Sequence, residues 1–522
     1  MASTIRETLL ERADDSHQAL LSGDDSWTWQ EYAAESARRA HVLSGLLDAE
    51  RPPHVGVLMD NTPELLFTLG AAGLGSLVVV GLNTTRRGDS LLADIRKADC
   101  QVVVADPRLM PLLDGLDLDG VQVVRSDDES YAAAVTAAPT TPPDAAPAPG
   151  SLFMLIFTSG TSGDPKAVRI THEKITFPGA YLVERLGLDR DDVLYVSMPL
   201  FHSNSVMAGW APGLTCGATI ALGEKFSASR LLEDVRRYGA TYLNYVGKPL
   251  SYVLATPELP DDADNPLRLA FGNEAGDRDI AAFARRFDCR VVDGFGSTEN
   301  AVVISRIPET PPGSLGQPME GIAVLDPETG EECPRAEFDE DGRVTNLDQA
   351  TGELVNTAGT GQFAGYYRDE AATSERMRDG KYWSGDLAYR DAAGFVYYAG
   401  RTADWLRVDG ENIAAAPVER VLLRCPAVSE AAVYAVPDPS SGDQLVAALV
   451  LRGDLDPLAW EAFLGRQPDL GPKQWPRYVR ILDALPRTAT NKVLKRSLKA
   501  EGLGPGGETW VRDERGTAYT IY

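Results

Sequence analysis

The first part of the chain alternates short, wholly apolar runs with longer stretches in which apolar residues recur at helical spacing. The apolar runs lie at residues 54–59, 76–81, 101–105 and 152–157. Runs of this length without polar alternation are typical of strands that are buried on both faces. One helical stretch opens with the capping box of Thr28 and Glu31 and extends to about residue 47, and another begins at Thr62 with Pro63 in its first turn. The alternation predicts a parallel sheet with helices on both faces.

The alternation continues beyond residue 190 and predicts a second parallel sheet. Further strands are expected at residues 193–198, 218–222, 242–246, 267–271 and 290–292, with helices between them. An Ala- and Pro-rich connector at residues 136–150 precedes the strand at 152–157. Because no G-x-G-x-x-G motif follows the first strand, a dinucleotide-binding fold is not predicted. The predicted fold class is therefore α/β, with a large N-terminal region of parallel, helix-covered sheets.

Composition narrows the class of function. The 522 residues exceed one ordinary domain. With 50 Lys and Arg against 76 Asp and Glu, the net charge is −26, and a surface this acidic disfavours nucleic acid and anionic membranes as partners. The five cysteines are far apart and the five histidines show no zinc-ligand spacing, which favours reduced thiols in a cytoplasmic protein. No signal peptide and no apolar run of membrane-spanning length is found, so we expect no stable membrane insertion.

A loop rich in hydrogen-bond donors follows the apolar run at 152–157. It contains Thr158, Ser159, Gly160, Thr161, Ser162, Gly163 and Lys166. Glycines allow the backbone to approach a ligand closely, hydroxyls donate further hydrogen bonds, and a lysine supplies a positive charge. A surface turn needs neither this many donors nor a lysine fixed by Pro165. The loop therefore predicts a polyphosphate site, although it does not match the Walker pattern.

This loop resembles the T-S-G-T-[ST]-G-x-P-K signature of the adenylate-forming superfamily of acyl-CoA synthetases, nonribosomal adenylation domains and luciferases. The segment from Pro199 to His202 is similar to the element P-[LY]-[FY]-H, which implies a place for His202 beside the acyl pocket. A lone histidine is otherwise more often structural.

Residues 293–299 resemble the superfamily element [DN]-x-Y-G-x-T-E. The match implies that Phe295 flanks the adenine, that Gly296 beside it also belongs to the cofactor site, that Thr298 binds the α-phosphate, and that Glu299 holds Mg²⁺ through a hard oxygen ligand. Phe295 replaces the usual tyrosine, which keeps the stacking and loses the phenol hydrogen bond. The residues at the preceding strand end are also expected near the nucleotide; they are Gly272, Asn273 and Glu274.

The C-terminal motifs complete the resemblance. Asp386 matches the aspartate that accepts hydrogen bonds from the ribose hydroxyls. Arg401 matches a residue that reaches the ribose or phosphates, Asp404 matches the hinge, and Lys492 matches the mobile catalytic lysine. The resemblance implies an N-terminal ATP- and acyl-binding domain of residues 1–403. It also implies a small, mobile α+β lid domain of residues 404–522, with strands near 431–436 and 445–451.

The expected acyl pocket contains several polar residues. Its lining is predicted to include Ser203, Asn204, Asn244, Tyr245, Val246, Lys248 and Asn300. A tunnel for a long saturated chain would be more uniformly apolar, so a medium-length, aromatic or functionalised acid is favoured.

Softer details resemble the very-long-chain acyl-CoA synthetase or fatty-acid-transport branch. They are the segment 81–88, Ala167 where most members have glycine, residues 410–412 and the tail 509–522. The resemblance implies an enzyme that uses ATP and Mg²⁺ to activate a small carboxylic acid as acyl-AMP and then transfers it to coenzyme A.

Two alternatives remain open at the level of the sequence. Some superfamily relatives activate nitrite with ATP and pass it to an aryl amine, which forms a diazo group, and the ATP motifs do not separate nitrite from a carboxylate. A nucleotide-binding protein without catalysis is disfavoured because Lys166, Glu299, Asp386 and Lys492 are all present.

Overall fold

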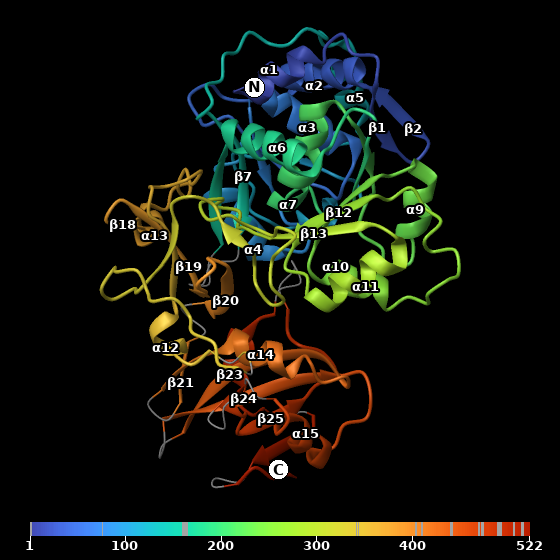
Figure 1. The fold of residues 1–522 in the computed structure, drawn as a ribbon. Coiled ribbons are helices and arrows are strands. Elements are labelled where there is room, and N and C mark those ends of the chain that lie inside the picture. The colour runs from blue at the N-terminus through green and yellow to red at the C-terminus, as the bar shows by residue number, and fades with distance from the viewer. Residues whose placement is uncertain are drawn as a thin grey trace. The chain divides into compact units, whose positions relative to one another are not determined.

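The computed structural model contains two compact units (Figure 1). One comprises residues 1–303 and 360–375, and the other comprises residues 304–359 and 376–522. The structure describes residues 3–75, 77–158, 165–340, 342, 344–401, 405–408, 411–438, 442–467, 470, 474–487, 493–504, 507–512 and 516–522. This division differs from the predicted boundary at 403/404, which stays a prediction because Asp404 lies outside the described residues.

One sheet of the first unit confirms the first predicted alternation. Its strands are β3 (His54–Leu58), β4 (Val78–Gly81), β5 (Val102–Ala105), β6 (Gln122–Arg125), β7 (Leu152–Thr158) and β8 (Lys166–Thr171). They run in the order β6-β5-β3-β4-β7-β8. The pairs are parallel except for β7 and β8. The antiparallel β7–β8 pair was not predicted: the predicted phosphate loop returns the chain beside the strand that it left, so that Thr158 and Lys166 become register partners.

The other sheet of the first unit confirms the second alternation. Its strands are β1 (Gln18–Ser22), β2 (Asp25–Thr28), β9 (Val193–Val196), β10 (Thr219–Leu222), β11 (Tyr242–Val246), β12 (Leu269–Asn273) and β13 (Arg290–Phe295). Within this unit they run in the order β13-β12-β11-β9-β10-β1-β2. The strands from β9 to β13 pair in parallel. Strand β12 begins and ends two residues later than the predicted 267–271, so Gly272 and Asn273 belong to the strand and not to the turn after it.

Helices cover these sheets (Figure 1). They are α1 (Ile5–Glu11), α2 (Trp29–Ser44), α3 (Pro63–Gly73), α4 (Gly88–Lys97), α5 (Glu129–Ala137), α6 (Glu173–Leu186), α7 (Ser203–Ser205), α8 (Ala211–Cys216), α9 (Leu231–Tyr238), α10 (Lys248–Leu254) and α11 (Asp277–Phe287). The capping box predicted at the start of α2 is confirmed: the Thr28 hydroxyl accepts from the Glu31 N–H, and the Glu31 carboxylate accepts from the Thr28 N–H at 2.7 Å. Thr62 caps α3 in the same way, with Pro63 as the first helical residue.

The second unit contains a sheet built from β16 (Ile322–Leu325), β17 (Gly352–Asn356), β18 (Met377–Arg378), β19 (Lys381–Arg390) and β20 (Val396–Arg401). The order is β16-β17-β19-β18, with β20 paired to β19. A short antiparallel pair, β14 (Ile304–Ser305) and β15 (Gln317–Pro318), and the helix α12 (Leu347–Ala350) also belong to this unit.

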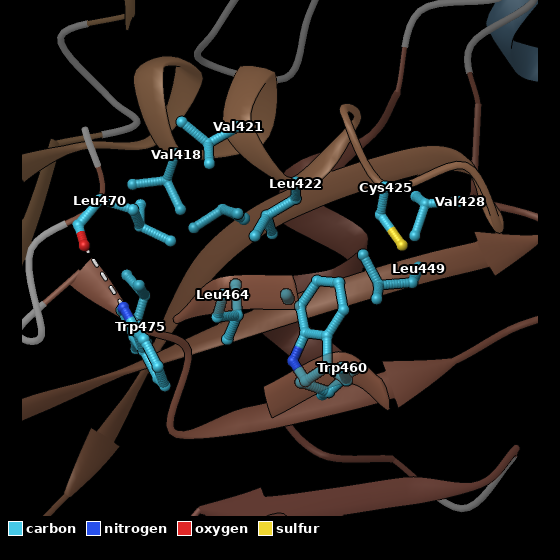
Figure 2. Packing of buried hydrophobic residues seen from close by; sticks show 14 of the residues in the cluster. Val418, Val421, Leu422, Cys425, Val428, Leu449, Trp460, Leu464, Leu470 and Trp475 are labelled. Atoms are coloured by element: carbon cyan, nitrogen blue, oxygen red, sulfur yellow. Dashed lines mark hydrogen bonds between the residues drawn. The ribbon is translucent and has the colours of Figure 1, made fainter. Parts of the chain in front are cut away.

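The last part of the second unit is an α+β layer, as the sequence predicts. Its strands are β21 (Trp405–Val408), β22 (Glu411–Ala414), β23 (Val428–Asp438), β24 (Gly442–Leu451), β25 (Tyr478–Ile481), β26 (Thr509–Arg512) and β27 (Tyr519–Ile521). Its helices are α14 (Ala415–Leu422), α15 (Pro457–Leu464) and α16 (Lys495–Glu501). Figure 2 shows its core, where Trp460 and Leu464 of α15 pack with Leu422 of α14 and Leu449 of β24. The Trp475 indole N–H donates to the Leu470 carbonyl at 3.3 Å (Figure 2).

None of the helices that the structure describes combines the length and the apolar character that a membrane span requires.

Candidate active site

The predicted phosphate loop joins β7 to β8, and Lys166 is the first residue of β8. Residues 159–163 of the loop lie outside the described residues, whereas Thr158 and Lys166 are paired across the two strands. The Lys166 side chain is buried. Its Nζ lies 3.6 Å from the exposed carboxylate of Glu375, on α13 (Glu370–Arg376), and 5.3 Å from the centre of the Tyr366 ring. The hairpin thus holds a buried cation directly beside the loop that is predicted to bind phosphate.

Tyr366 connects Lys166 with Glu299. An isolated bridge with Val168 joins the backbone of Tyr366 to β8. One face of its ring lies against the Lys166 ammonium, and its hydroxyl donates to Glu299 Oε1 at 2.7 Å. Two residues that are far apart in the sequence, and that were both predicted to act on ATP, are therefore brought to one place.

The side chains around Tyr366 suit an Mg²⁺ ion whose ligands come mainly from ATP. The described residues contain no group of three or more His, Cys, Asp or Glu side chains that would bind a metal ion by themselves. Mg²⁺ is commonly bound by one or two carboxylates together with substrate phosphates. The Glu299 carboxylate, near the lysine that is predicted to bind phosphate, fits this mode. Glu299 would hold the ion, and the ion would neutralise charge on the phosphates.

The strand end before His202 is held by a residue that the sequence analysis missed. Asn61, which follows β3, donates through Nδ2 to the carbonyls of Met198 at 2.9 Å and Gly223 at 3.1 Å. Its Oδ1 accepts from the Leu200 N–H at 2.9 Å. The sequence signal that could have identified Asn61 is its position as a polar residue shortly after a parallel strand. Asn61 fixes the turn that leads to His202, whose ring lies 4.5 Å from that of Phe201.

The asparagines of the predicted acyl pocket bind one another. Asn244 Nδ2 donates to Asn204 Oδ1 at 2.6 Å, and Asn204 Nδ2 donates to the Tyr245 carbonyl at 3.1 Å. Asn273, which was predicted to lie near the nucleotide, donates through Nδ2 to the Gly294 carbonyl at 2.8 Å. These amides tie α7 to β11 and β12 to β13. Their N–H groups are engaged within the protein.

The other residues predicted to line the pocket are placed as follows. The Tyr245 side chain is buried, and its hydroxyl donates to Asp293 Oδ2 at 2.9 Å. The Ser203 hydroxyl lies 2.9 Å from that of Thr298, which brings two predicted site residues into contact. Asn300 donates to the Gln362 side chain. Val246 ends β11 and is half-buried, and the side chain of Lys248 lies outside the described residues.

The backbone at residues 272–274, where β12 ends, restricts which residues can occupy these positions. A Cβ at Gly272 would lie 2.2 Å from the Tyr245 carbonyl oxygen of the neighbouring strand, so only glycine fits there. Glu274 follows with φ of 67°, a left-handed conformation that is uncommon for a residue other than glycine. Strained backbone of this kind is concentrated at functional sites. Phe295 and Gly296 stand at the end of the adjacent strand β13.

The second unit carries the predicted ribose-binding residues. Asp386 of β19 is buried and is the register partner of Arg401 on β20. The residue before it, Gly385, has φ of 75° and donates its N–H to Glu353 Oε1 at 2.6 Å. Glu353 is 3% exposed and forms an ion pair with Arg378 at 3.0 Å. Glu353 therefore fixes the bend that presents Asp386.

Three predictions in this unit fall partly or wholly outside the described residues. They concern the side chain of Arg401, the hinge Asp404 and the catalytic Lys492. Their roles stay predictions.

Comparison with known proteins identifies the family of the chain. Residues 10–367 match the family model of the AMP-binding enzymes, and residues 417–492 match that of the AMP-binding enzyme C-terminal domain. The chain is 53% identical to the medium/long-chain-fatty-acid–CoA ligase FadD17 of Mycobacterium marinum, over 98% of this chain and 99% of that protein. It is 48% identical to the steroid-22-oyl-CoA synthetase of Rhodococcus jostii, over 96% of this chain and 91% of that protein.

The fold is also that of a solved structure, ATP-bound MatB from Rhodopseudomonas palustris. The two share a TM-score of 0.84 at 24% identity, over 96% of this chain and 99% of MatB. The likeness in fold, together with the matches along the whole chain, shows that the protein belongs to the family of AMP-binding enzymes.

Proposed function

We propose that this enzyme activates an apolar carboxylic acid, either a medium- or long-chain fatty acid or the side-chain acid of a steroid. The reaction is that of an ATP-dependent, AMP-forming acyl-CoA ligase, which first makes acyl-AMP and then the coenzyme A thioester. The observation that carries the reaction is the placement of Lys166 and Glu299 on two sides of Tyr366, at the end of the phosphate loop. The choice of acid rests on the names of relatives that are 48% and 53% identical over nearly the whole chain.

The first half-reaction joins two anions. A carboxylate oxygen attacks the α-phosphorus of ATP, a bond forms between them, and the bond from this phosphorus to the bridging oxygen of pyrophosphate breaks. Such a transfer depends on positioning and on neutralising charge. In this proposal Lys166 binds the departing phosphates, Thr298 donates to the α-phosphate, and Glu299 holds Mg²⁺. Asp386 accepts from the ribose hydroxyls, as an ionised carboxylate does well.

The second half-reaction forms the thioester. The coenzyme A sulfur attacks the acyl carbon, the bond from this carbon to the AMP oxygen breaks, and AMP leaves. The resemblance assigns Lys492 to the first half-reaction and the rotation about Asp404 to the change between the two. His202, held at the end of β9 by the Asn61 hydrogen bonds, would border the acyl group in both.

The pairing of the pocket amides changes the earlier expectation about the acid. Unpaired amide groups beside methylenes would each cost roughly 1–3 kcal/mol, and this cost was the reason to disfavour a long chain. In the structure Asn204 and Asn244 donate their N–H groups to protein acceptors, whereas Asn244 Oδ1 is buried without a hydrogen-bond partner among the described residues. The pairing therefore removes part of the cost that argued against a long acyl chain.

The proposal is tested by measuring AMP, pyrophosphate and thioester with ATP, Mg²⁺, coenzyme A and a panel of acids. The panel holds fatty acids from octanoate to palmitate, steroid acids with a carboxylated side chain, and benzoates. We expect thioester from the fatty or steroid acids at a kcat/KM at least tenfold above that of the benzoates. A preference for benzoates would contradict the proposed acid.

The nitrite alternative belongs in the same assay, because no observation favours it and the relatives named above are CoA ligases. Nitrite with an aryl amine is expected to release no pyrophosphate. Release that requires nitrite and ignores coenzyme A would replace the ligase assignment.

A further inference from the structure

The ammonium of Lys97, the last residue of α4, joins two segments that lead to the candidate active site. Its Nζ donates to the Pro165 carbonyl at 3.0 Å and to Asp369 Oδ2 at 3.2 Å. The side chains of Lys97 and Asp369 are 27% and 24% exposed, so this ion pair is largely shielded from solvent. Pro165 directly precedes Lys166, and Asp369 directly precedes α13. Lys97 therefore holds the start of β8 against the start of α13.

Asp369 uses its other oxygen atoms to order the beginning of α13. Its Oδ1 accepts from the Ala372 N–H at 3.1 Å, which is the bonding pattern of an N-cap carboxylate. Its backbone carbonyl accepts from the Thr373 hydroxyl at 2.9 Å, and the oxygen of that hydroxyl accepts from the Tyr366 N–H at 3.0 Å. The ion pair with Lys97 is thus connected to the backbone of Tyr366 by two further hydrogen bonds.

Both ends of this connection lead to groups that are predicted to act on ATP. One end leads to Lys166, whose Nζ lies 3.6 Å from the carboxylate of Glu375 on α13. The other end leads to Tyr366, whose hydroxyl donates to Glu299 and whose ring lies against the Lys166 ammonium. A shift of the start of α13 away from β8 would therefore displace the phosphate-binding lysine and the residue that orients the predicted Mg²⁺ ligand.

A lysine at the end of a helix usually makes an exposed ion pair that contributes little. Arg96, the residue before Lys97, shows this ordinary case: it pairs with Asp117, and the two side chains are 56% and 73% exposed. Lys97 differs because its pair is shielded and because its two acceptors belong to segments that are distant from each other in the sequence. Its contacts therefore fix the position of one segment relative to the other.

We propose that Lys97 is a positioning residue of the adenylation site. Through its two bonds it keeps Lys166 and Tyr366 in place for the β- and γ-phosphates of ATP and their Mg²⁺ ion. This inference rests on the proposed function. Lys97 does not touch the nucleotide itself. Because acyl-AMP and AMP lack the β- and γ-phosphates, the contribution of Lys97 is confined to ATP and to the first half-reaction.

Calorimetric titration with ATP and Mg²⁺, and separately with AMP, tests this inference without any acid. The wild type is compared with Lys97→Met and with the control Arg96→Met, in the same turn of α4. We expect Lys97→Met to weaken ATP binding by roughly tenfold and to change AMP binding by less than about twofold, since one hydrogen bond to a charged group is lost. Arg96→Met should match the wild type. Unchanged ATP binding in Lys97→Met, or equal weakening for ATP and AMP, would overturn the proposal.

A double variant tests whether the ion pair is the route of the effect. Asp369→Asn removes the charge partner and keeps an oxygen that can cap α13. Because both residues act on one contact, Lys97→Met together with Asp369→Asn should weaken ATP binding by clearly less than the product of the single losses. Fully multiplicative losses would contradict an effect through this pair. If Lys97→Met does not fold, Asp369→Asn alone is compared for ATP and AMP with the same expected outcomes.

Steady-state kinetics and a conservative variant separate positioning from general stability. In Lys97→Met, KM for ATP should rise, while thioester formation from supplied acyl-AMP should stay close to that of the wild type. Lys97→Arg retains a cation that can donate to both acceptors, so it should recover a large part of the lost affinity for ATP. Equal losses in the two half-reactions, with no recovery by arginine, would show a purely structural lysine.

Failure of the proposed function has a different signature, which is the absence of thioester from the wild type with every acid of the panel. The calorimetric comparison of ATP with AMP does not depend on the acid. A selective loss of ATP affinity in Lys97→Met would still support the positioning role, and equal affinities in the variant and the wild type would contradict it.

Discussion

Tyr366 contacts both charged groups that are predicted to act on ATP. Its ring faces the Lys166 ammonium, and its hydroxyl donates to Glu299 at 2.7 Å. A hydrogen bond to a charged group contributes about 1.5–3 kcal/mol. The bond sets the direction of one oxygen of the carboxylate that is predicted to hold the metal ion. Orientation of a ligand by a neighbour of this kind commonly decides metal affinity.

We expect Tyr366→Phe to lower kcat by roughly 10–10²-fold, from the loss of this one charged hydrogen bond. The Mg²⁺ concentration for half-maximal activity should rise, because Glu299 is no longer held in one orientation. Activity measured across a Mg²⁺ titration reports both effects. Tyr367→Phe is the matched control in the next residue. An unchanged Mg²⁺ titration in Tyr366→Phe would show that this hydroxyl does not orient a metal ligand.

The buried side chain of His172, which joins the start of α6 to α1, makes the stability of the folded protein depend on pH. It precedes α6, is 1% exposed, and accepts the Ile5 N–H of α1 through Nδ1 at 3.3 Å. Burial lowers the pKa of His172 to about 4, below the ordinary value of 6.5. The unfolded chain therefore binds a proton between these two values that the folded chain does not bind. Stability is lost as the pH falls through this window.

The expected loss of unfolding free energy from pH 7.5 to pH 4 is about 3 kcal/mol for this one group, taking 1.36 kcal/mol for each unit of pKa. The measurement is denaturant unfolding of the wild type and of His172→Gln at both pH values. The variant, which has no titrating ring, should be less stable at pH 7.5 and lose less on acidification. Equal losses in both proteins would show that His172 is not the group responsible.

The helix α13 places a carboxylate where a phosphate is expected. Glu375 is exposed and lies 3.6 Å from Lys166 Nζ. If Lys166 binds the phosphates as proposed, ATP replaces this ion pair. Exposed ion pairs contribute about 0.2–1 kcal/mol, so Glu375→Gln should lower KM for ATP by roughly 1.5- to 5-fold.

Steady-state kinetics at varied ATP gives this value, and Glu370→Gln, at the start of the same helix, is the control. A higher KM for ATP in Glu375→Gln would indicate instead that Glu375 helps to bind the nucleotide.

In the molecule taken as a whole, the residues that are predicted to act in the reaction come from both units. Lys166, Thr298 and Glu299 belong to the first unit, whereas Asp386 and Lys492 belong to the second. The resemblance to the family implies that the lid presents Lys492 only for adenylation. A cation that serves one half-reaction should leave the other nearly intact.

Lys492→Ala is therefore expected to slow adenylation by roughly 10²–10³-fold and to change thioester formation from supplied acyl-AMP far less. The two half-reactions are measured separately, with Lys499→Ala, an exposed lysine of α16, as the control. Equal losses in both half-reactions would contradict the assignment.

The amino-acid sequence was enough to predict the features that depend on neighbouring residues. Buried strands, the capping box at Thr28 and the proline start of α3 follow from local patterns, and the structure confirms them. The motif order likewise identified the family, because each motif is a short continuous segment. The sequence analysis did not predict that β8 pairs with β7 in the antiparallel direction, because apolar runs do not reveal the direction of pairing.

Which of these segments come into contact could be learned only from the folded chain. The Tyr366–Glu299 hydrogen bond, the Asn61 bonds to the turn before His202, and the Glu353 bond behind Asp386 each join residues that are distant in sequence. Such contacts arise when whole strands and helices pack. Their geometry is set by topology and by competition for buried space, which no local pattern records.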